Sequence, residues 1–163
     1  MLPSTPQLFE DIRAVLSPSQ GRVVPLLSNT ATIKVSGDDT AGQLTVIEYK
    51  IAPHGPSPAP HRHKYVEVFY MLAGSLTFNV EGREVTGTAG ATIIVPAGVV
   101  HTYRNESPEP ARYLVICSPA GLDKYFEELA ELIRAEPVWP PKDMSQVIAL
   151  NEKYDTEVVL PSR

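Results

Sequence analysis

Residues 55–74 read GPSPAPHRHKYVEVFYMLAG and join a proline-rich loop to a run of strand-forming residues. Within this run His61, His63 and Glu67 occupy positions of the same parity. Side chains alternate between the two faces of an extended strand, so these three project to one side if no bulge intervenes. The stretch therefore predicts two imidazoles and a carboxylate that converge on one face of a strand.

A second stretch, residues 90–105, reads GATIIVPAGVVHTYRN. Pro96 and Gly98 predict a turn, so His101 begins the next strand and is expected to reach the same interior from across a barrel. Imidazole nitrogen together with carboxylate oxygen suits one divalent iron, manganese, nickel, cobalt, copper or zinc ion, whereas calcium and magnesium prefer oxygen alone. Four protein ligands leave coordination positions open, as in a catalytic or ligand-binding metal site.

Short strands are predicted on both sides of these two stretches. The 16 prolines and 10 glycines lie between short runs of β-branched and aromatic residues, and Glu81-Gly82 predicts a hairpin turn. Eight or so antiparallel strands in this length favour a β-sandwich or a jelly-roll barrel. In the segment 44–51 the odd positions are expected to face the core. The predicted strands are 23–27, 30–35, 44–51, 61–72, 76–80, 83–85, 92–95, 101–105 and 112–117.

Helices are predicted near both ends. Thr5-Pro6 favours a helix start, and apolar residues then recur on one face over 6–16. After Pro119 the apolar spacing changes to that of an amphipathic helix over 122–133, which Pro137 ends. We expect these terminal segments to pack around the β core or to form a subunit contact.

Two further features are predicted in the C-terminal segment. Asp143 with Gln146 resembles a capping box, and residues 156–160 are compatible with a last short strand.

Composition favours a protein that acts on small molecules. The formal net charge is -5 and the basic residues are scattered, which argues against nucleic acid and anionic membranes as partners. The single cysteine, Cys117, cannot form an internal disulfide and is expected to be a small buried hydrophobe. The first residues show no signal-peptide pattern, which favours a cytoplasmic location.

Ten positions with fixed spacing resemble the two motifs of the cupin superfamily, G(X)5HXH(X)3,4E(X)6G and G(X)5PXG(X)2H(X)3N. The resemblance covers residues 55–105 in detail and about 30–118 in general pattern. It implies a double-stranded β-helix, or jelly roll, in one all-β domain over 1–163, with a core barrel at about 23–118 and a C-terminal helical segment at about 119–151. It also implies that the four ligands line the inner wall and that the protein is a homodimer. The ten matching residues are Gly55, His61, His63, Glu67, Gly74, Gly90, Pro96, Gly98, His101 and Asn105.

The segment after Pro119 is similar to the C-terminal helix of small bacterial cupins of the quercetin dioxygenase kind. That likeness implies a metal-dependent dioxygenase acting on a flavonol or another enolisable aromatic compound, with Glu67 as both metal ligand and proton acceptor. A non-redox isomerase or decarboxylase, and a non-catalytic small-molecule binder, remain alternatives, because one fold carries many chemistries.

Several of these residues have a structural alternative. Glu67 could form a salt bridge with Arg62 or Arg104 in place of a metal bond. His54, outside both motifs, is expected to be an ordinary loop residue or a group at the rim of the pocket. Four apolar or aromatic side chains are candidates for substrate contact, although a core role is favoured for each of them and the two roles can coincide: Tyr49, Phe69, Met71 and Tyr103.

Overall fold

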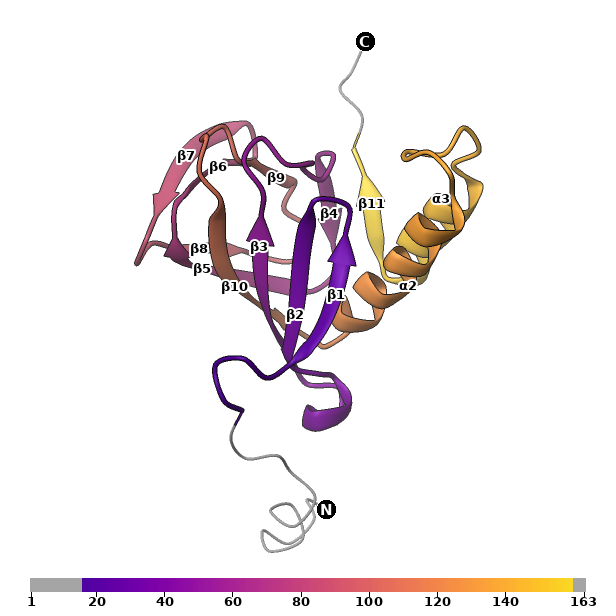
Figure 1. Cartoon of the computed structure of the whole chain (residues 1–163), viewed down its shortest axis with the longest axis horizontal. Helices are drawn as coiled ribbons and strands as arrows, with labels where there is room; N and C mark the ends of the chain where they lie inside the picture. Colours follow the sequence, from indigo (N-terminus) through magenta and orange to yellow (C-terminus); the bar gives the residue numbers. More distant parts are fainter. Residues whose placement is uncertain (1–15, 160–163) are drawn as a thin grey trace, which may run out of the picture.

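Two antiparallel sheets form the body of the protein in the computed structural model, which describes residues 16–159 (Figure 1). The predicted helix over 6–16 falls outside the described residues, apart from Leu16. The six-stranded sheet has, in spatial order, β1 (Arg22–Leu26), β2 (Asn29–Val35), β3 (Thr45–Ile51), β10 (Ala111–Ser118), β5 (Val66–Ala73) and β8 (Thr92–Val95). The five-stranded sheet has β11 (Thr156–Val158), β4 (His61–His63), β9 (His101–Arg104), β6 (Ser75–Val80) and β7 (Arg83–Thr88).

The core lies between the inner faces of the two sheets, as expected for a jelly-roll barrel. In β3 the odd positions are buried and the even positions are at least partly exposed, which confirms the predicted alternation. Strand β10 lies between β3 and β5, and every second residue of it is buried. The largest side chains that are fully enclosed include Tyr113, Phe69 and Phe78. Aromatic residues therefore fill much of the barrel interior.

The chain crosses from one sheet to the other where the sequence predicted a single strand over 61–72. Residues 61–63 form β4 in the five-stranded sheet, and residues 66–73 form β5 in the six-stranded sheet. Lys64 and Tyr65 make the connection. The assumption of one uninterrupted strand was wrong, because a strand that closes a barrel has to change sheets.

The turn at Glu81-Gly82 is confirmed. Its residues have φ of 50° and 78°, and the flanking residues Val80 and Arg83 pair directly across the β6–β7 hairpin. Two consecutive positive φ angles characterise the type I′ turn, whose twist matches that of the strands it joins.

Two helices follow the barrel strands on one side of the molecule (Figure 1). Helix α2 (Leu122–Ala135) packs against β1 and β3, and its Phe126 ring lies 5.6 Å from that of Tyr49. Helix α3 (Ser145–Lys153) packs against α2 and β11. A short 3-10 turn, η1 (Asp38–Thr40), connects β2 with β3.

The predicted capping box is only half formed. Asp143 Oδ1 accepts a hydrogen bond from the Ser145 backbone N–H at 2.9 Å, but among the described residues no hydrogen bond from Gln146 back to Asp143 completes the box, and the boundary residue Met144 makes no side-chain cap. Within residues 16–159, neither α2 nor α3 has the length and apolar character of a membrane-spanning helix.

Candidate metal centre

Three histidines come together on two neighbouring strands of the five-stranded sheet. His61 and His63 are two residues apart on β4 and share its inner face. His101, the first residue of β9, pairs directly with His61 across the ladder, and the two ring centroids are 4.4 Å apart. Directly opposed side chains on antiparallel strands are close neighbours. His101 therefore lies beside the other imidazoles. The expectation that it reaches them from across the barrel was wrong.

Glu67 supplies the fourth group from the opposite sheet, where it is the second residue of β5. Its Oε2 lies 2.9 Å from His63 Nε2 and 2.9 Å from His101 Nε2. One ligand atom from each of the four residues falls within 4.8 Å of every other. The side chains of residues 61, 63 and 67 do converge, but not because they share one face of a single strand. They converge because the inner faces of two sheets, which carry β4 and β5, lie opposite each other.

The histidine tautomers make this cluster suitable for a cation. His61, His63 and His101 each place Nδ1 within 3.0 Å of a backbone carbonyl oxygen. A carbonyl oxygen only accepts, so each Nδ1 carries a hydrogen, and a neutral ring then presents a lone pair at Nε2.

Two of these Nε2 atoms face one carboxylate oxygen. Such contacts are repulsive unless a proton or a metal ion lies between the atoms. The cluster is therefore able to hold a metal ion, and its nitrogen and oxygen donors suit several transition metals.

Electrostatics keeps His61 neutral and Glu67 ionised, which are the forms of these two groups that bind metals. Burial, reinforced by the nearby His101, lowers the pKa of His61 to about 4, so this ring is neutral at pH 7. Burial alone would raise the pKa of Glu67, but hydrogen bonds from His101 and His63, which form when a proton lies between Nε2 and the carboxylate, together outweigh burial and lower the pKa to about 2. An ionised carboxylate is the ligand form, whereas a strong proton acceptor needs a pKa nearer to neutrality.

The structure also decides between the alternatives for Glu67. Arg62 forms a two-point ion pair with Glu157, and Arg104 pairs with Glu84 and Glu106. Both arginines thus have carboxylate partners outside the barrel, and Glu67 is buried at 5% exposure.

The four candidate substrate contacts lie in the barrel interior. Tyr49, Phe69 and Met71 are buried core residues, and Tyr103 is half-buried. The Phe69 ring lies 6.4 Å from that of His101 and 5.9 Å from that of Tyr103. These side chains therefore have a core role in the structure, and substrate contact stays a prediction for each.

The sequence analysis missed one aromatic neighbour of the cluster, Tyr65, and one aromatic residue of the inner wall, Tyr113. Tyr65 stacks on the His63 ring at 3.7 Å with an interplanar angle of 4°. Tyr113 donates a hydrogen bond from its hydroxyl to the Tyr103 hydroxyl at 2.7 Å. The odd-numbered alternation along 112–117 is a signal that could have placed Tyr113 inside. Nothing local marks Tyr65, because it lies in the connection between the sheets.

The motif residue Asn105 supports the backbone. Asn105 donates to the carbonyls of Ala52 and Glu109 and accepts from the Ser107 N–H, so its side chain fixes the turn that follows β9. His54 is exposed in its loop, as expected.

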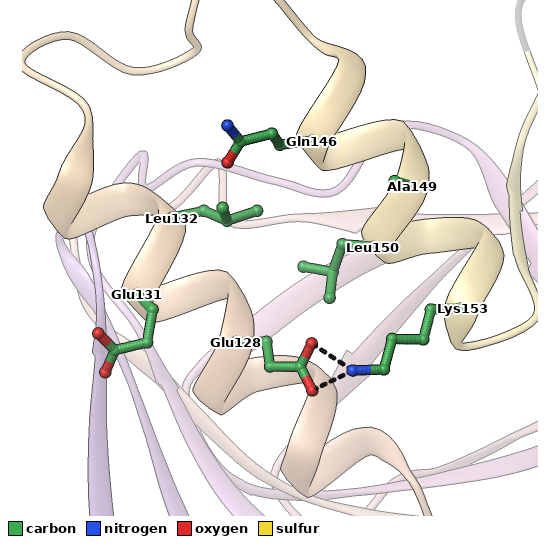
Figure 2. A pocket seen from close by; sticks show the side chains of 7 residues that line it. All are labelled: Glu128, Glu131, Leu132, Gln146, Ala149, Leu150 and Lys153. Carbon is green, nitrogen blue, oxygen red and sulfur yellow. Dashed lines mark hydrogen bonds and ion pairs between the residues drawn. The ribbon is translucent and has the colours of Figure 1, made fainter.

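A separate groove of about 410 Å³ lies between α2 and α3 (Figure 2). Leu132 and Leu150 line it, and an ion pair between Glu128 and Lys153 closes one end. None of the residues that line this groove belongs to the His/Glu cluster. The cluster is therefore the better candidate for chemistry.

The fold and the cluster together define a small jelly-roll protein with an internal site able to hold a metal ion. A family model described as a cupin domain matches residues 47–117, so the chain contains a cupin domain.

Two curated relatives are similar to part of the chain. An endoribonuclease YbeY of Myxococcus xanthus is 36% identical over 87 residues, which are 53% of this chain and 28% of that protein. A quercetin 2,3-dioxygenase of Bacillus subtilis is 31% identical over 94 residues, 57% of this chain and 27% of that protein. The matches thus span little more than a quarter of the length of these relatives, and the two names describe different activities.

Among solved structures, the polyketide cyclase RemF from Streptomyces resistomycificus is similar with a TM-score of 0.59 and 21% identity. The similarity covers 66% of this chain and 80% of that one. At this level of identity the likeness establishes the fold alone.

Proposed function

We propose that this protein is a metal-dependent dioxygenase that acts on a flavonol or a related enolisable aromatic compound. The observation that carries the proposal is the meeting of three imidazoles and one carboxylate beside an aromatic inner wall. The partial likeness to a quercetin 2,3-dioxygenase supports the same choice.

The ligand set determines the kind of chemistry proposed. A bound divalent ion would act as a Lewis acid towards an enolate oxygen and would serve dioxygen chemistry. His61, His63 and His101 would hold the ion through Nε2, because their Nδ1 atoms are engaged with backbone carbonyls. Glu67 would be an ionised ligand through Oε2, and accepting a substrate proton would be a secondary role for it.

The aromatic wall favours a planar, unsaturated substrate. Phe69, Tyr103 and Tyr113 meet one another edge to face with centroids 5.5–5.9 Å apart. Ring edges carry partial positive charge and attract the faces of other rings, so such a wall suits an aromatic ligand. The paired hydroxyls of Tyr103 and Tyr113 add the polar groups that would orient a phenolic or enolic oxygen.

The test is oxygen uptake by metal-free protein reconstituted separately with iron, manganese, nickel, cobalt, copper and zinc. We expect at least one redox-active metal to support uptake with a flavonol, and His101→Ala to abolish it. Absence of uptake with every flavonol and related enol would refute the proposal. Oxygen-independent turnover with zinc would instead favour the isomerase or decarboxylase, and saturable binding of an unchanged compound would favour the non-catalytic binder.

We also propose that the protein works as a cytoplasmic homodimer. Val66, Tyr70 and Ile94 are 39%, 43% and 62% exposed on the outer face of the six-stranded sheet. Beside them Glu48 and Arg112 form a pair of opposite charges, which a two-fold axis can match with its own copy. An apolar sheet face with such a rim suits a second copy of the chain.

Sedimentation of two matched variants tests this contact. Ile94→Lys should convert a dimer to a monomer, whereas Val85→Lys, on the other sheet at 49% exposure, should leave the dimer intact. A monomeric wild-type protein at micromolar concentration would refute the proposed dimer.

A further inference from the structure

Cys117 lies beside Glu67 in the six-stranded sheet. On β10 it pairs across the ladder with Glu67 of β5 on one side and with Thr45 of β3 on the other. Its side chain is fully buried, and its Sγ lies 3.6 Å from Glu67 Oε1. Sulfur is larger than oxygen, so a thiol hydrogen bond is longer than one from a hydroxyl. This cysteine therefore contacts the proposed metal ligand itself.

The two oxygens of Glu67 have separate surroundings. Oε2 faces His63 and His101 at 2.9 Å, and Oε1 faces the thiol. Within residues 16–159, Cys117 is the one hydrogen-bond donor to Oε1. Leaving a buried carboxylate oxygen without a hydrogen-bond donor costs free energy. Loss of the thiol would therefore destabilise this orientation of Glu67 by more than the strength of a thiol hydrogen bond alone.

The thiol is the donor of this contact. An ionised carboxylate oxygen only accepts, so the hydrogen between Cys117 Sγ and Glu67 Oε1 belongs to the thiol. The thiol is fully buried and faces the carboxylate, so orientation of Glu67 is the role that its position supports.

We propose that Cys117 is a positioning residue for Glu67: its thiol holds Oε1 against the sheet so that Oε2 alone faces the three imidazoles. The inference rests on the proposed metal-binding function of the cluster. Groups that hold metal ligands in place commonly change metal affinity 10-fold to 100-fold when they are removed.

Substitutions at position 117 separate the donor from the volume it fills. Cys117→Val keeps a similar buried volume and removes the donor, whereas Cys117→Ser keeps a donor. Val115→Ala is the matched packing control, because Val115 is buried on the same face of β10 at 2% exposure and pairs with Phe69 and Ile47 instead of Glu67.

The experiment is a titration of metal-free protein with Co²⁺. Calorimetry gives the affinity, and the visible absorption of the bound ion reports its ligand geometry. We expect Cys117→Val to bind Co²⁺ about 10-fold more weakly and to change the spectrum, because Glu67 is free to turn. Cys117→Ser should bind within about threefold of wild type, and Val115→Ala should keep both affinity and spectrum. In a Glu67→Gln background, Cys117→Val should lower the Co²⁺ affinity much less than it does in wild type, because the effects of coupled residues are not additive.

Melting curves without metal show whether each variant is folded. Wild-type affinity and spectrum in Cys117→Val would overturn the inference while leaving the metal site in place. Equal losses in Cys117→Ser and Cys117→Val, or an equal loss in Val115→Ala, would also overturn it by assigning the effect to packing. If wild-type protein itself binds no Co²⁺, the proposed metal function fails first and the positioning role falls with it.

Discussion

Removal of His101 gives a quantitative test of the metal centre. A metal present at 100 times its dissociation constant should stabilise the native protein by about 2.7 kcal/mol. For a chain of 163 residues this corresponds to a rise in Tm of roughly 5–11 °C. His101 supplies one of the four ligand atoms and is 1% exposed, so water cannot readily take its place.

We expect His101→Ala to lower the metal affinity at least about 100-fold. Loss of a residue that only supports a ligand can already lower metal affinity by that much, and His101 is a proposed ligand itself. At the same metal concentration the stabilisation then falls to about 0.4 kcal/mol and the rise in Tm to about 1–2 °C. The Tm of each variant is measured by calorimetry with and without metal. The packing energy lost with the imidazole ring lowers both Tm values, so it cancels in the metal-induced rise.

His54→Asn is the matched control, because His54 is exposed, lies outside the cluster and has a φ of 49° that asparagine tolerates. It should show the full wild-type rise in Tm. An undiminished rise in His101→Ala would refute the assignment of this residue as a ligand.

Three further predictions concern stability without metal. The pKa of His61 is lowered to about 4, so the unfolded chain takes up this proton first and stability should fall as pH drops from about 6.5 towards 4; thermal melts across this range should show a shallower slope in His61→Gln. Tyr113→Phe removes the hydrogen bond to Tyr103 and should cost about 1–3 kcal/mol in urea unfolding, and an unchanged midpoint would contradict that hydrogen bond. Gly74→Ala should cost about 2–4 kcal/mol, because φ is +71° and a Cβ would meet a carbonyl oxygen at 2.7 Å, whereas Gly82→Ala, with φ of +78° and open space, should cost about 1 kcal/mol; equal costs would argue against the steric contact.

The sequence alone was sufficient for most of the strands and for the four residues that make up the cluster. Alternating burial in β3 and the turn at Glu81-Gly82 follow from local rules, since a strand period of two and a left-handed turn depend on nearby residues only. His61, His63, Glu67 and His101 were named from spacing, and the structure brings all four together.

Only the tertiary structure decided how these groups meet and what surrounds them. The change of sheet at Lys64 and Tyr65 moved Glu67 to the opposite wall, and the ladder placed His101 beside His61. Contacts such as Cys117 with Glu67 join residues 50 positions apart. Local spacing reports the face of a strand, but closing two sheets into a barrel sets which faces meet, and that depends on the packing of the whole core.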